Sequence, residues 1–74
     1  MLTANERIAT AIVQIEELKS TLESIKDEEQ EALENMPESL QESERGEHMQ
    51  EIIDYLEEVD SSLEEANDNL FNIE

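Results

Sequence analysis

The residue types that perform acid–base and nucleophilic chemistry are sparse in this chain, apart from carboxylates. The single histidine, His48, would need an orienting partner and a cleft to act as a general base, and the sequence indicates neither. No serine lies in a Gly-x-Ser-x-Gly turn, and a single glycine excludes the glycine-rich loops that bind nucleotide phosphates. The sequence therefore predicts no catalytic residue and no cofactor, and hence a protein that is not an enzyme.

Carboxylates are abundant, with 22 Asp and Glu residues, so a metal site has to be considered. Calcium loops place oxygen ligands around a sharp glycine turn, and no Asp-x-Asp-x-Asp-Gly stretch occurs. Di-iron bundles use Glu-x-x-His, whereas Glu44 and His48 are four residues apart. The chain has no cysteine, which excludes disulfides and the common zinc frameworks. No metal ligand is predicted.

The carboxylates instead form an acidic surface. The formal net charge is -18, and residues 27–74 hold 18 acids against Arg45 alone. In the second half of the chain the acids recur on the side away from the apolar positions, and an aromatic ring accompanies them. These candidate partner-binding residues are Glu51, Asp54, Tyr55, Glu57, Glu58, Glu64, Glu65 and Asp68. Such a surface repels nucleic acid and anionic membranes and attracts basic proteins.

The excess of charge has two interpretations. A solvated face keeps a protein soluble, but a small domain needs only a modest net charge for that purpose. Acids also lie near the C-terminal end of the first predicted helix, where they oppose the helix dipole. They are Asp27, Glu28, Glu31 and Glu34. A surface that imitates nucleic acid accounts for this unfavourable placement, and both interpretations stay open at this point.

Two stretches with helical periodicity must position these acids. Their apolar residues recur at gaps of three and four residues, the pattern of a coiled-coil seam. Small residues and Met36, Met49 and Ile73 complete the two arrays, and Glu29 fills one seam position. The expected core and dimer contacts are the large aliphatic members, which are Ile8, Ile15, Leu18, Leu22, Ile25, Ile52, Leu56, Val59, Leu63 and Leu70.

Local signals set the ends of the two helices. Thr3-x-x-Glu6 matches a capping box, and Pro37 disfavours helical geometry at Met36. We expect one domain over residues 1–74, with helices over about 4–35 and 46–73 and a connection over about 36–45. The connection allows the second helix to fold back on the first. The predicted fold is all-α, an antiparallel two-helix hairpin with coiled-coil packing.

A two-helix hairpin leaves some apolar residues outside its seam. Residues flanking the seam or lying further out are Ile12, Val13, Leu33, Ile53, Tyr55 and Phe71. The simplest explanation is a homodimer, in which two hairpins form a four-helix bundle. The alternative is a docking patch for another protein.

Targeting signals are lacking in the sequence. No stretch is apolar for long enough to cross a membrane, and the first residues lack the basic and apolar regions of a signal peptide. We therefore expect a soluble, cytoplasmic protein.

The connection and the heptads after it carry a likeness to known proteins. Residues 36–45 read Met-Pro-Glu-Ser-Leu-Gln-Glu-Ser-Glu-Arg, and acidic heptads such as Leu56-Glu57-Glu58 follow. Over roughly the last two-thirds of its length the chain resembles small acidic helical proteins of phages and mobile elements of gut bacteria. In size and charge it is also similar to acidic anti-CRISPR and anti-restriction inhibitors, which occupy the DNA site of a host nuclease. The resemblance implies a bacterial host cell and carries over no functional residues.

The leading hypothesis is a non-enzymatic, DNA-mimicking inhibitor. Its acidic face would dock on a basic nucleic-acid-binding protein, such as a nuclease or another defence effector. The alternative is a structural coiled-coil adaptor or assembly factor that binds through apolar seam residues. Binding by the first should weaken steeply with salt, and binding by the second should not.

Overall fold

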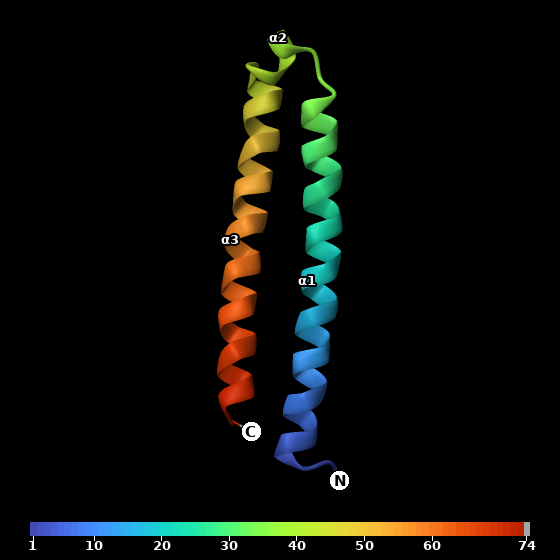
Figure 1. Cartoon of the computed structure of the whole chain (residues 1–74), viewed down its shortest axis with the longest axis vertical. Helices are drawn as coiled ribbons and strands as arrows, with labels where there is room; N and C mark the ends of the chain where they lie inside the picture. Colours follow the sequence, from blue (N-terminus) through green and yellow to red (C-terminus); the bar gives the residue numbers. More distant parts are fainter. Residues whose placement is uncertain (74) are drawn as a thin grey trace.

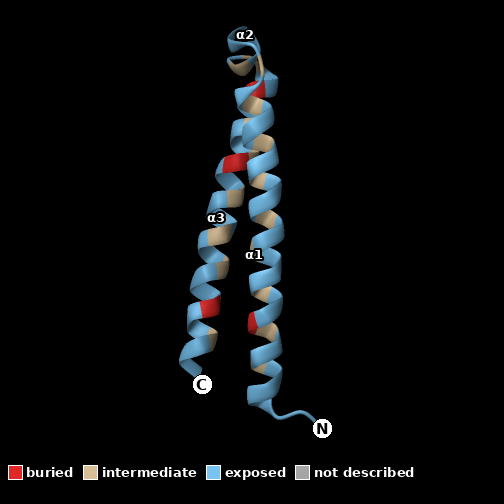
Figure 2. Cartoon of the chain, turned by 45° about the vertical axis from the view of Figure 1, so that its right-hand side comes forward, coloured by how far each residue is buried: buried red, intermediate tan, exposed pale blue. Residues whose placement is uncertain are grey.

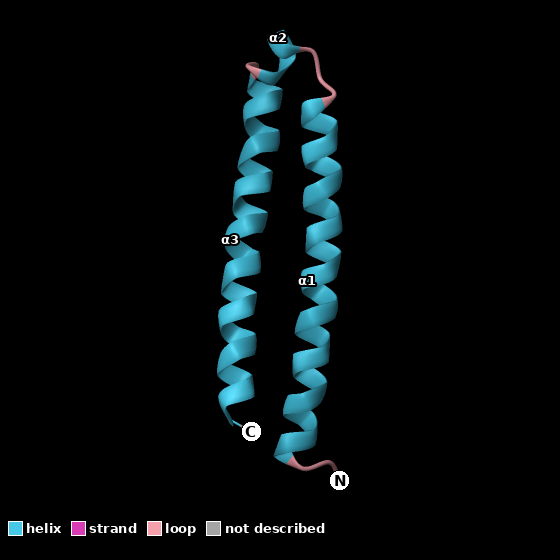
Figure 3. Ribbon diagram, viewed as in Figure 1, coloured by secondary structure: helices cyan, strands magenta, loops and turns pink. Residues whose placement is uncertain are grey.

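Two long antiparallel helices make up almost the whole molecule. The computed structural model describes residues 1–73. Helix α1 runs over Ala4–Glu34 and α3 over Glu44–Ile73, with a short helix, α2, over Glu38–Gln41 between them (Figure 1, Figure 3). Both ends of the chain lie at the end of the hairpin opposite α2 (Figure 1). The predicted all-α helical hairpin is confirmed for the described residues.

The predicted capping box is present at the start of α1. The backbone N–H of Glu6 donates to Thr3 Oγ1 at 3.2 Å, and the backbone N–H of Thr3 donates to Glu6 Oε1 at 3.2 Å. Two backbone donors that lack partners within the helix are thereby satisfied. At its other end α1 closes with Asn35 as the C-cap, two residues before Pro37.

Helix α2 closes the hairpin by covering carbonyl groups at the end of α1. The side-chain amide of Gln41 donates from Nε2 to the carbonyl oxygen of Met36 at 2.9 Å. The backbone of Gln41 also lies directly against the first turn of α3, where a Cβ atom on Gly46 would overlap the Gln41 carbonyl oxygen. The close approach of α2 to α3 therefore requires glycine at position 46.

The helices meet along a seam with a strict heptad spacing. We call it the hairpin seam, and every member is buried or half-buried (Figure 2). Its residues on α1 and just beyond the end of that helix are Ile8, Ile12, Ile15, Lys19, Leu22, Lys26, Glu29, Leu33 and Met36. Its residues on α3 are Gly46, Met49, Ile53, Leu56, Asp60, Leu63, Asn67 and Leu70. Within the described chain Ile12 and Ile53 are the buried hydrophobic residues, so the core is small.

The hairpin seam differs from the seam predicted by periodicity. Leu18, Ile25 and Val59, predicted as core or dimer contacts, lie outside this seam and are 46%, 41% and 43% exposed in the single hairpin. The other predicted large residues lie in the seam, except Ile52, which is half-buried beside it. The predicted and observed seams have every other position in common. A small rotation of each helix about its axis therefore replaces the remaining predicted positions by those that the structure uses.

The register that the structure adopts brings Ile12, Leu33 and Ile53 into the contact. It also admits polar residues. Lys19 and Lys26 are half-buried there, as expected where the aliphatic stem of a lysine covers apolar surface. Lys19 Nζ lies 3.6 Å from Glu64 Oε2, an ion pair between the two helices. Sequence periodicity missed this seam because it counts such lysines as polar.

Asn67 is the least favourable member of the seam. It is 8% exposed, and its side-chain oxygen has no hydrogen-bond partner among residues 1–73. An unsatisfied buried acceptor costs about 1–3 kcal/mol. We expect Asn67→Leu to raise the free energy of unfolding by about 1–2 kcal/mol, measured by urea unfolding followed by circular dichroism. Asn72→Leu, at an exposed position, is the control and should change little. A destabilised Asn67→Leu variant would show that the amide stabilises this packing.

Candidate functional site

The acids predicted to bind a partner are all exposed on α3. They are Glu51, Asp54, Glu57, Glu58, Glu64, Glu65 and Asp68, and we call them the acidic face. Glu57 and Glu64 border the hairpin seam, where Glu64 meets Lys19 of α1. Across the same border, Glu23 of α1 lines a small hollow with Asp60. Both helices therefore contribute carboxylates to this side of the hairpin.

Little of the charge on the acidic face is neutralised. Among residues 1–73 the ion pairs that involve it are Lys19–Glu64 and His48–Glu51, the latter at 3.8 Å and only when His48 is protonated. The Glu64 side chain is 64% exposed and that of Glu51 is 70% exposed, so solvent screens both pairs. The Gln50 amide donates to Asp54 Oδ1 at 2.9 Å without cancelling its charge. The face is available to an external cationic partner.

A second surface lies on the other side of the hairpin. On each helix a row of apolar residues, spaced seven residues apart, lies directly beside the hairpin seam. Because antiparallel helices are related by a two-fold axis perpendicular to the hairpin, these corresponding rows face the same side. We call this surface the open flank, formed by Ala11, Leu18, Ile25, Ala32, Ile52, Val59, Ala66 and Ile73.

The open flank carries almost no negative charge. The next row outward on each helix consists of Arg7, Gln14, Thr21, Glu28, His48, Tyr55, Ser62 and Asn69. Glu28 is therefore the single acid in the flank and in the rows outward of it, and Glu29 is half-buried in the adjoining seam row, although the chain has 22 acids. The hairpin thus separates an acidic side from an apolar, nearly neutral side, a division that depends on the observed seam and does not follow from sequence periodicity.

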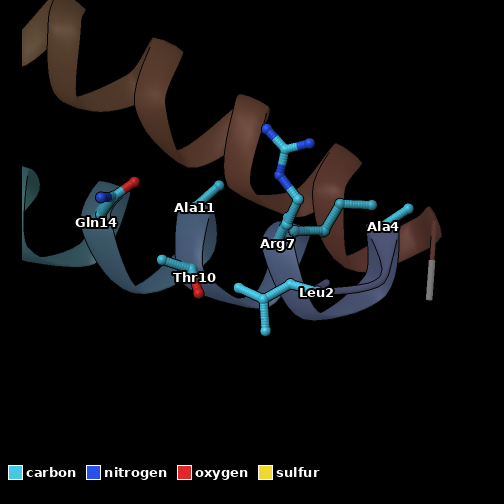
Figure 4. A pocket seen from close by; sticks show the side chains of 7 residues that line it. Leu2, Ala4, Arg7, Thr10, Ala11 and Gln14 are labelled. Carbon is cyan, nitrogen blue, oxygen red and sulfur yellow. The ribbon is translucent and has the colours of Figure 1, made fainter.

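Shallow hollows on this side are lined by flank residues. One, of about 570 Å³, is lined by Leu2, Ala4, Arg7, Ile8, Thr10, Ala11 and Gln14. Figure 4 shows the Arg7 side chain standing between Ala4 and Ala11 in this hollow. Another, of about 290 Å³, includes Tyr55 and Val59. Tyr55, 67% exposed, lines this second hollow with Val59 of the open flank and Glu58 of the acidic face, so it lies at the border between the two surfaces.

The described residues contain no group of three or more His, Asp and Glu side chains arranged to hold a metal ion. His48 is 73% exposed and has Glu51 as its ion-pair partner. Within residues 1–73, no helix combines the length and apolar character needed to span a bilayer. The arrangement offers two surfaces for macromolecular contact.

Comparison with known proteins does not assign a role to either surface. Neither models of known protein families, nor curated proteins, nor solved structures gave a match to this chain. The acidic face and the open flank are the features from which a function can be argued.

Proposed function

We propose that the protein is a non-enzymatic inhibitor whose acidic face occupies the basic nucleic-acid-binding surface of another protein in the bacterial cytoplasm. The observation that carries this proposal is the segregation of exposed carboxylates, nearly all without a cationic neighbour, on one side of a rigid rod. A nuclease or another defence effector has the complementary basic channel.

The charge density of the rod supports the comparison with nucleic acid. Residues 1–73 carry 21 of the 22 acids and all four bases, which leaves 17 net negative charges. The molecule is 57 Å long, so one net charge falls on about every 3.4 Å of its length. Each strand of duplex DNA also carries one charge per about 3.4 Å of helix axis. The hairpin therefore has the linear charge of one DNA strand, which is half that of the duplex at one charge per about 1.7 Å.

Apolar side chains beside the acids add selectivity that charge lacks. Phe71 follows Glu57 and Glu64 at the same heptad spacing on α3 and is 50% exposed. Val13, on α1, is 51% exposed. Exposed aromatic rings are common anchors in protein interfaces, whereas rim charges mainly steer and orient the encounter. The acidic face thus combines long-range attraction with short-range contacts.

We expect binding of the target to fall steeply with salt. The immobilised protein is exposed to bacterial lysate at about 0.1 and 0.5 M salt, where the Debye length shrinks by about half. A nucleic-acid-binding protein should be captured at the lower salt concentration, lost at the higher one and displaced by duplex DNA. Mass spectrometry identifies it. A partner without a basic groove, retained at both concentrations and indifferent to DNA, would contradict the proposal.

A coiled-coil adaptor is the second candidate function. The observation in its favour is the open flank, because Leu18, Ile25 and Val59 leave an apolar surface exposed. Its binding would depend on that surface and vary little with salt.

We also propose that the inhibitor is a homodimer, in which two hairpins form a four-helix bundle. Two buried hydrophobic residues are few for a chain of 74 residues. Small domains commonly gain the missing burial by association.

A further inference from the structure

We infer that the open flank is the docking surface for a second copy of this chain, which packs in the antiparallel sense with its α2 at the opposite end of the bundle. The inference rests on the homodimer proposed above and specifies its contact surface and orientation. It does not depend on the identity of the inhibitor's target.

Charge selects the open flank over the other sides of the hairpin. Two copies repel each other wherever acids face acids, and this chain carries a net charge of -18. The open flank and the rows outward of it hold one acid, Glu28, and the adjoining seam rows add only the half-buried Glu29, whereas acids crowd the opposite side. A strongly charged partner gains nothing from a neutral apolar surface. A second copy of the same surface matches it in both hydrophobicity and charge.

A whole side of the hairpin is of the size that a stable pair requires. The hairpin measures 57 × 16 × 14 Å, so the side that contains the open flank and its bordering rows presents about 800–900 Å². Standard protein interfaces bury about 800 Å² on each partner. Leu18, Ile25 and Val59, which are 41–46% exposed in the single hairpin, would become the centre of the contact.

The distribution of acids along the hairpin favours the antiparallel orientation. The end that contains α2, residues 27–54, holds eleven acids and one base. A parallel pair would bring both of these ends together. An antiparallel pair places each beside the less acidic end of the partner, which contains Arg7 and Lys19.

The two charged residues of the α1 border fit the same orientation. Arg7 lies eleven residues before Leu18, and Glu28 lies ten residues after it. When two α1 helices cross antiparallel at Leu18, Arg7 of one copy comes opposite Glu28 of the partner subunit, and the symmetric contact occurs twice. The acidic faces of both copies then point outward, on opposite sides of the bundle.

Sedimentation equilibrium tests the contact surface. The unmodified chain should sediment as a dimer. Combining Leu18→Glu with Val59→Glu should raise the dimer dissociation constant at least about a hundredfold, since two-fold symmetry places four carboxylates in the contact. The control combines Val13→Glu with Phe71→Glu, equal changes at similarly exposed apolar positions outside the flank, and should remain dimeric. Circular dichroism checks that both variants stay helical.

A charge exchange tests the orientation. Arg7→Glu and Glu28→Arg should each raise the dimer dissociation constant about tenfold, and the double variant should return it to within about threefold of the original. Positions 7 and 28 are separated by about 31 Å on one helix, so their coupling must be intermolecular. No rescue in the double variant would overturn the antiparallel orientation.

The outcomes separate this inference from the proposed function. A dimer that tolerates Glu at positions 18 and 59 overturns the flank as contact surface and leaves the homodimer standing. A chain that remains monomeric up to about 1 mM overturns both. Neither result changes the salt-dependent capture of a target by the acidic face.

Discussion

Replacing Glu51, Glu58 and Glu65 together by lysine is expected to weaken target binding by a factor of about 10²–10³. The three carboxylates follow one another at seven-residue intervals, about 10.5 Å apart along the outer side of α3. Each reversal removes an attraction to a basic groove and introduces a repulsion. Glutamate and lysine have similar helix propensities, so the variant should keep its helical content.

The control for this variant changes the same amount of charge on the other helix. Glu17, Glu23 and Glu31 are exposed on α1, and their joint replacement by lysine gives the same net charge. Binding of the target identified by capture is measured for both variants by titration at about 0.1 M salt. If the two variants lose equal affinity, total charge governs binding rather than the acids of α3. If the α3 variant binds normally, those acids are only a solvated surface.

Local signals explain why much of the fold was predictable. Thr3 and Glu6 are three residues apart, and Pro37 acts on its immediate neighbour, so the start and the end of α1 depend on short segments. The exposure of the acids was equally predictable, because a chain with four bases cannot pair 22 acids. These features require no knowledge of how the helices meet.

The hairpin seam depends on contacts between distant residues and could not be read from periodicity. Two heptad patterns share Ile8, Ile15 and Leu22, and the apolar count favours the pattern that the hairpin leaves exposed. The hairpin instead closes through the other pattern, which contains Gly46 and its close contact with Gln41. The side on which Tyr55 lies follows from this choice. The open flank therefore could not be predicted before the residues of the hairpin seam were known.

The two heptad patterns give each helix two apolar edges, and the different contacts of these edges connect the fold to the proposed function. One edge closes the hairpin, although Lys19, Asp60 and Asn67 occupy some of its positions in place of apolar residues. The other, richer in aliphatic residues, stays exposed in the single hairpin and is the edge on which we propose that a second copy docks. The acids occupy the remaining circumference, where neither contact covers them. A stable rod with uncovered carboxylates is what a nucleic-acid decoy requires.

Adjacent isoleucines on α3 provide the sharpest test of which edge closes the hairpin. Ile53 is 3% exposed in the hairpin seam, whereas Ile52 is half-buried beside it. Ile53→Ala should lower the free energy of unfolding by about 2–5 kcal/mol, because it leaves a cavity between α1 and α3. A core of this size supplies no more than about 3–5 kcal/mol, so this variant should be largely unfolded.

Ile52→Ala is the matched control, since it removes the same atoms one position away. Its cost within the hairpin should be about 1 kcal/mol, for a side chain that is already partly in water. Urea unfolding followed by circular dichroism gives both values. Measuring at two protein concentrations separates the hairpin from the dimer, because only the dimer's contribution changes with concentration. If Ile52→Ala unfolds the chain while Ile53→Ala is tolerated, the hairpin closes through the pattern containing Leu18 and Val59. The open flank would then be its interior rather than a docking surface.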